Sequence, residues 1–197
     1  MTDLREKFPD HDQYALLTSH GFGDAFGGLW LERDDLDEIV RLLGADPPAR
    51  RDATLADAMS GTSGDVPEGL VWVGPHTPGW SAVINLAPVG GAPMNLQMLS
   101  GRRRGLEVSW LMDVDGLYGL DWYEEDGHVE ELPAFWGGHL EEGSVFRPYV
   151  SGLVRDYADD GGDEPLAHTC LTVAGRITGR FLDEAWFHTP GRVYELP

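Results

Sequence analysis

The sequence predicts a single α+β domain spanning residues 1–197, in which an antiparallel sheet of about five to six strands packs against three to four helices. Its 197 residues, 42% of them hydrophobic, suit one sizeable core. The dipeptides Asp115-Gly116 and Asp126-Gly127 each separate strand-like runs, which predicts a β-meander near 105–132. Apolar residues at helical spacing mark separate segments, which supply the helices.

The clearest helix lies between Asp34, which is placed to cap it, and Gly44, which is placed to end it. Its apolar residues recur at i, i+3, i+4 and i+7: Leu36, Ile39, Val40 and Leu43. Similar signals predict a short helix after Thr54, one over 149–158, and a last one from Asp163 to Gly179.

Outside the meander, strands are expected at 25–31, at 69–74 and at 80–86, the last two as a hairpin. The run 14–18 is short and apolar and reads as a strand or turn. Residues 180–197 read as a tail with a final strand at 192–196, and we expect segment 1–12 to be mobile.

The position of Asp121 depends on the register of the meander. A two-residue loop at Asp115-Gly116 would pair Val114 with Leu117 and set Asp121 opposite Trp110 on the apolar face. Either the Asp121 carboxylate is then buried and partnered, or a bulge shifts the register and turns it outward.

Composition excludes several classes of function. The formal net charge of −20 argues against nucleic-acid and anionic-membrane partners, which select clustered positive charge. The one basic cluster, 102–104, reads as a solvated turn, with a phosphate site as the alternative. No membrane-spanning run or secretion signal is visible, and the single cysteine, Cys170, reads as a buried apolar group, so we expect a cytoplasmic protein.

Motifs for metals, cofactors and nucleophiles are incomplete or missing. Acidic residues from Asp113 to Glu124 match a calcium loop in part, but Leu117 and Tyr118 occupy positions that need an oxygen ligand and a glycine. No P-loop, dinucleotide fingerprint or nucleophile elbow is present. We therefore expect no metal and no cofactor.

Four short stretches resemble a family of uncharacterised actinobacterial proteins that share a domain of unknown function. They are 39–46, the Val-Gly step before Gly79-Trp80, 99–102 and 177–179, and the resemblance covers about 14–182. It implies a small acidic α+β domain and supplies no activity, cofactor or catalytic residue.

The leading functional hypothesis is a non-enzymatic interaction module, of immunity or inhibitor type, that binds a basic protein partner. The residues expected to bind it are Glu124, Glu125, Asp126, Glu130, Glu131 and Trp136. One alternative is a hydrolase or transferase with a site made of Asp121, His128 and His139. Another is a small-ligand pocket lined by the loop tryptophans Trp80, Trp136 and Trp186.

Overall fold

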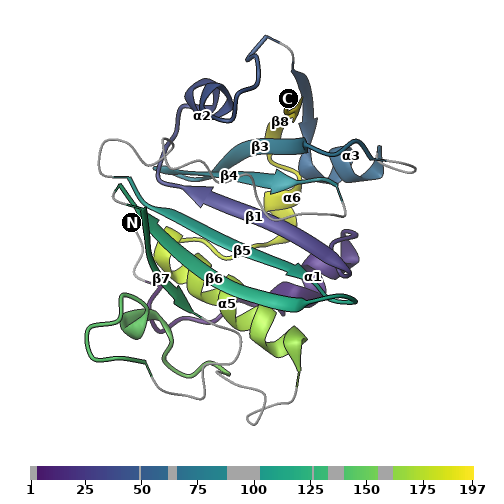
Figure 1. Ribbon diagram of the computed structural model, residues 1–197. Coiled ribbons are helices and arrows are strands. Elements are labelled where there is room, and N and C mark those ends of the chain that lie inside the picture. Colours follow the sequence, from purple (N-terminus) through teal and green to yellow (C-terminus); the bar gives the residue numbers. More distant parts are fainter. Residues whose placement is uncertain are drawn as a thin grey trace.

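A computed structural model describes residues 4–48, 50–61, 66–87, 103–125, 127–132, 140–154 and 162–197. They form one antiparallel sheet of eight strands in the order β2-β8-β3-β4-β1-β5-β6-β7 (Figure 1). The strands are β1 (Ala25–Leu31), β2 (Arg51–Thr54), β3 (Leu70–Thr77), β4 (Trp80–Asn85), β5 (Gly105–Leu111), β6 (Gly116–Glu124), β7 (Gly127–Leu132) and β8 (Pro190–Glu195). The helices are α1 (Gln13–Ser19), α2 (Leu36–Leu42), α3 (Leu55–Ser60), α5 (Asp163–Thr178), α6 (Glu184–Phe187) and the 3-10 turn η2 (Arg147–Tyr149).

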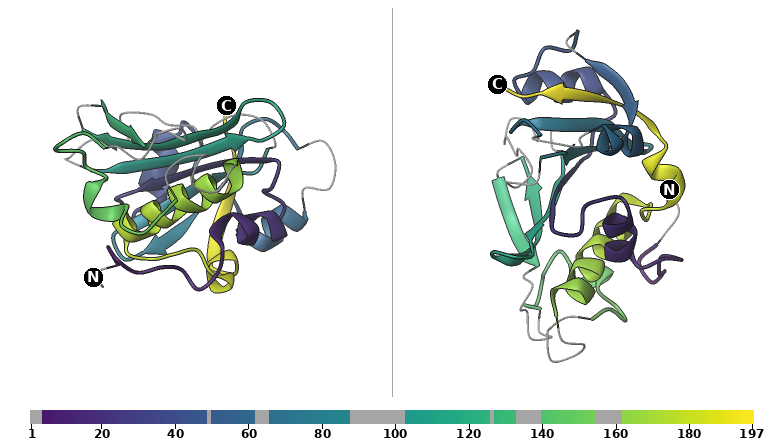
Figure 2. Two further views of the ribbon diagram at one scale, coloured as in Figure 1. Left: turned by 90° about the horizontal axis from the view of Figure 1, so that it is seen from below. Right: turned by 90° about the vertical axis from the view of Figure 1, so that its right-hand side faces the viewer.

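The sheet has two faces, which we name after the helices that cover them. The α5 face carries the larger core, in which α5 packs against β5 and β6 and contacts α1. The α2 face carries a smaller apolar cluster, in which Ile39 and Val40 of α2 pack with side chains of β1, β3, β4 and β8. Figure 1 shows α2 near the β3 and β8 end of the sheet, far from β7, and Figure 2 shows α1 and α5 together on the other side of the sheet.

The α+β class and the antiparallel meander are confirmed, but the predicted number of strands is too low. β2 was not predicted. β8 overlaps the final strand predicted at 192–196, but it does not lie in a tail, since it pairs with both β2 and β3 inside the sheet. Both strands are short and gain their stability from partners distant in sequence, which local patterns do not reveal.

Two helix assignments were wrong in the described residues. The run 14–18 belongs to α1, which Asp12 caps by accepting a hydrogen bond from the Ala15 amide at 2.8 Å. The predicted helix over 149–158 is absent over 149–154, where η2 ends and Gly152 has a φ of +73°. The remainder of that helix lies outside the described residues.

The helices α2, α3 and α5 match their sequence signals, whereas α6 lies in the stretch that was expected to be a tail. Asp35 rather than Asp34 caps α2, because the Asp34 carboxylate instead accepts a hydrogen bond from the Gly79 amide. α5 ends as expected at Gly179, whose φ of +88° lies in the left-handed region. None of the helices in the described ranges is both long and apolar enough to cross a membrane.

The register of β5 and β6 decides where Asp121 points. Leu111 pairs with Gly116, so residues 112–115 form a longer loop than the predicted two-residue turn. A bulge beside Ser109 then sets Asp121 opposite Glu107, so the predicted pairing with Trp110 is wrong and the bulge alternative holds. Asp121 therefore lies on the α2 face, away from Trp110 and the larger core.

Candidate functional site

A single row of directly paired residues crosses the whole sheet on the α2 face. From β2 to β7 its members are Asp52, Arg192, Val73, Val83, Leu29, Glu107, Asp121 and Glu131. The three apolar members are completely buried. The last three positions, which we call the carboxylate row, place one acidic side chain on each of β5, β6 and β7.

The carboxylate row is electrostatically coupled to its neighbours. Partial burial and the Asp121 carboxylate raise the pKa of Glu131, whereas His128 opposes that rise. Burial, followed by the charges of Asp121, Glu107 and Glu131, raises the pKa of the Tyr123 phenol. The Tyr123 hydroxyl donates to Glu107 at 3.5 Å. Burial is the largest cause of both pKa shifts, and the neighbouring carboxylates add to it.

The structure brings together two of the three residues of the enzymatic alternative. His128 Nε2 lies 2.8 Å from Asp121 Oδ1, and the two side chains are 46% and 27% exposed. His139 lies outside the described residues. Cys170 cannot serve this pair as a nucleophile, because it lies in the core of the α5 face and burial raises the pKa of its thiol to about 12.

The residues expected to bind a partner do not all share one surface. Glu124 and Glu125 are exposed at the end of β6, where the Trp122 indole donates to Glu124 at 3.1 Å. Glu131 belongs to the carboxylate row, whereas Glu130 points to the α5 face and accepts hydrogen bonds from Ser144 and Val145. Asp126 and Trp136 lie outside the described residues.

Exposed apolar side chains accompany the acidic residues of the meander. Four large hydrophobic side chains are exposed in the part of the chain that the structure describes: Phe8, Val114, Tyr118 and Val129. The last three belong to the meander. An acidic surface with apolar side chains nearby has the composition of a protein-binding region rather than a purely solvated one.

The described part of the basic cluster is engaged within the protein. Arg104 makes a forked pair with Glu32, from Nε to Oε2 at 2.9 Å and from Nη2 to Oε1 at 2.8 Å. Its guanidinium also lies over the rings of Trp80 and Trp122. Arg103 donates to the Glu32 carbonyl. Arg103 and Arg104 therefore link the start of β5 to the end of β1, which disfavours both the phosphate and the solvated-turn interpretations.

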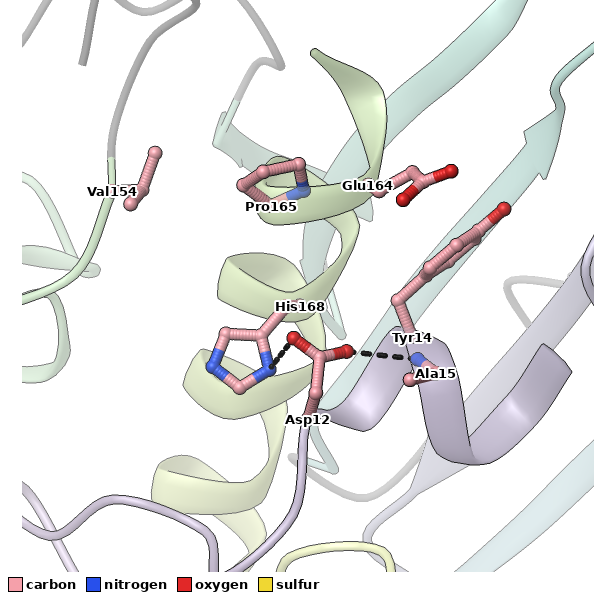
Figure 3. Close-up of a pocket in the computed structure, with 7 residues that line it drawn as sticks. All are labelled: Asp12, Tyr14, Ala15, Val154, Glu164, Pro165 and His168. Atoms are coloured by element: carbon pink, nitrogen blue, oxygen red, sulfur yellow. Dashed lines mark hydrogen bonds and ion pairs between the residues drawn. The ribbon is translucent and has the colours of Figure 1, made fainter. Parts of the chain in front are cut away.

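A separate cavity of about 350 Å³ lies where α1 and α5 begin (Figure 3). Its lining residues are Asp12, Tyr14, Ala15, Val154, Glu164, Pro165 and His168. None of them is a tryptophan. Trp80 and Trp186 are instead buried in the core, so these two indoles do not line the pocket that the sequence suggested. Trp136 lies outside the described residues.

His168 connects α5 to the first turn of α1. The Gln13 amide donates to His168 Nδ1 at 3.0 Å, so this nitrogen is an acceptor and the ring proton resides on Nε2. Burial lowers the pKa of His168, and the nearby Asp12 carboxylate only partly opposes this. His168 is therefore a neutral donor that also caps α1.

Sequence reasoning missed several of these residues. The alternation of Glu107 with Leu106 and Val108 was the available signal for its place on the α2 face. Asp12 was missed as a cap because the run after it was assigned to a strand. No local signal links Asp12 to His168, since these residues lie far apart in the sequence.

No group of three or more His, Cys, Asp or Glu side chains within the described ranges is arranged to hold a metal ion. The resemblance to the actinobacterial family stays a prediction. No protein-family model, curated protein or solved structure matches the chain.

Proposed function

We propose that the protein is a non-enzymatic interaction module, of immunity or inhibitor type, that binds a basic protein partner through the β5–β7 part of its α2 face. The observation that carries the proposal is the carboxylate row, in which Glu107 pairs with Asp121 and Asp121 with Glu131. Like charges directly opposite on neighbouring strands are unfavourable by about 0.2–1 kcal/mol per pair. Cationic side chains of a partner would turn this repulsion into attraction.

Two further features support a protein partner. The net charge of −20 favours fast association with a positively charged surface. Val114, Tyr118 and Val129 are exposed on the same meander and supply apolar contact area. Neighbouring strands lie about 4.8 Å apart, so the row suits a partner whose Lys or Arg side chains project at similar spacing.

The test compares two variants of equal net charge. The row variant carries Glu107→Gln, Asp121→Asn and Glu131→Gln. The control variant carries Asp46→Asn, Glu68→Gln and Glu195→Gln, three exposed carboxylates outside the meander. A partner captured from the native host by the unmodified protein would be purified, and its dissociation constant measured by calorimetry with each variant.

We expect the row variant to weaken binding about 100-fold and the control variant to weaken it by less than about threefold. The affinity of the unmodified protein should also fall as salt rises, because exposed charges are screened. Equal affinities for the two variants would rule out the carboxylate row as the binding surface. Failure to capture any stoichiometric partner at low salt would count against the interaction module itself.

A further inference from the structure

The cavity between α1 and α5 is lined by acidic side chains and by apolar ones. Asp12 and Glu164 supply carboxylates, and the lining residues within the described ranges include no lysine or arginine. Ala15, Val154, Pro165 and the Tyr14 ring supply apolar surface. The volume of about 350 Å³ is near the lower end of the range of small-molecule pockets, about 300–1,000 Å³.

The two oxygens of the Asp12 carboxylate have different neighbours. Asp12 Oδ1 accepts from the Ala15 amide, whereas Asp12 Oδ2 lies 3.4 Å from His168 Nδ1. Since that nitrogen already accepts from the Gln13 amide, it carries no proton in the neutral ring and two acceptors face each other. Asp12 is half exposed, so a donor can reach Oδ2 from the cavity.

The other polar groups of the cavity fit the same kind of ligand. Glu164 adds a second negative charge in the first turn of α5 (Figure 3). His168 Nε2 lies 3.5 Å from the Thr172 hydroxyl, and the neutral His168 ring adds no positive charge to the lining. Among the described lining residues, an anionic ligand would meet two carboxylates and no cationic side chain.

We propose that this cavity binds a small organic ammonium compound with a short apolar or aromatic body. The ammonium group donates to Asp12 Oδ2 and faces Glu164, while the body packs against Val154, Pro165 and the Tyr14 ring. This site is separate from the proposed partner surface, because α1 and α5 lie on the opposite face of the sheet from the carboxylate row (Figure 2).

The experiment uses benzylammonium as the probe and follows backbone amide shifts of the full chain by NMR. We expect saturable shifts confined to the start of α1 and of α5, including Ala15 and His168, with a dissociation constant on the order of 1 mM. Benzyl alcohol, which has the same ring but no charge, should bind about tenfold more weakly. Benzoate should produce no saturable shifts.

Single substitutions connect binding to the named carboxylates. Asp12→Asn keeps a residue that caps helices well, and Glu164→Gln keeps the size of the side chain. Each should weaken benzylammonium binding about three- to tenfold, whereas Glu68→Gln, at an exposed position away from the cavity, should leave it unchanged. Glu164→Gln serves as the independent variant if Asp12→Asn loosens α1.

Three results would overturn the proposal. They are equal binding of benzylammonium and benzyl alcohol, shifts that increase without saturating, and unchanged affinity in both carboxylate variants. Because neither variant touches the carboxylate row, failure here would leave the partner-binding proposal standing.

Discussion

The two ends of the α2 face use the same row of paired strand residues for opposite purposes. At one end Val73, Val83 and Leu29 are completely buried in the cluster that α2 covers. At the other end the row continues as Glu107, Asp121 and Glu131, on strands that lie away from α2 (Figure 1). The backbone alternation is the same throughout, so coverage by a helix is what distinguishes a core position from a surface position.

The covered apolar end and the acidic end of the row differ in what they contribute to stability and to binding. Burying one Val or Leu side chain stabilises a fold by about 1.5–3 kcal/mol, whereas opposed carboxylates destabilise it. Such a cost is expected to persist where the charges are used by a ligand or partner. The covered end therefore holds the fold together, and the acidic end is the better candidate for recognition.

The largest expected effect comes from extending the acidic row into the covered end. Leu29→Glu would place a carboxylate beside Glu107 at a fully buried position and should destabilise the protein by about 5 kcal/mol, measured by urea unfolding. The reciprocal change, Glu107→Leu, should change the free energy of unfolding by less than about 1 kcal/mol. Similar losses for both variants would show that the two ends are equally buried in solution.

Lowering the pH should destabilise the protein through a buried histidine on the α5 face of the sheet. His76 is 2% exposed on the α5 face, and burial, with the nearby Arg180 charge, lowers its pKa to about 3. Its Nε2 donates to the Arg180 carbonyl at 3.1 Å. Because the folded pKa is below the unfolded value of about 6.5, the stability linked to His76 is complete above pH 6.5.

That stability is lost as the pH falls from about 6.5 toward 3, with an upper limit on the order of 5 kcal/mol. His168, whose pKa is also lowered, acts in the same direction. Urea unfolding across this range should show the decline, and His76→Gln should flatten it, although that variant is less stable at neutral pH. The exposed-site control His11→Gln should retain the full slope; a flat profile in the unmodified protein would contradict the buried, neutral His76.

A smaller change in stability is expected from a substitution within the carboxylate row itself. Glu131→Gln removes one like-charge pair with Asp121 and should stabilise the fold by about 0.2–1 kcal/mol at pH 7. Glu195→Gln, on the far side of the sheet, is the matched control and should change stability less. Destabilisation by Glu131→Gln in thermal unfolding would indicate that Glu131 makes a favourable contact instead.

The smallest effect should come from salt. Raising the ionic strength screens repulsion among exposed carboxylates, so the unmodified protein should gain a few tenths of a kcal/mol in stability. The row variant proposed above should gain less than the unmodified protein. Chemical unfolding in urea at several sodium chloride concentrations measures both gains, and an equal gain would assign the repulsion to other acidic residues.

Sequence reasoning worked best where structure is local. The span of β1 was predicted correctly, and the capped start of α3 at Thr54 and the end of α5 at Gly179 follow from capping chemistry and a left-handed glycine. Sequence reasoning missed β2 and the pairing of β8, which joins distant segments. It also missed α1, whose seven residues are too few for a clear helical period.

The candidate sites divide in the same way. The enzymatic alternative grouped Asp121 with His128, and the two side chains lie 2.8 Å apart. The sequence by itself determined the acidity, the β-meander and the alternation by which Glu107 and Leu106 point to opposite faces of the sheet. Only the tertiary structure decided which residues meet in the carboxylate row and in the cavity. A bulge changes register by a residue, α2 covers only part of one face, and α1 meets α5 through non-local packing, and none of these is encoded in a local pattern.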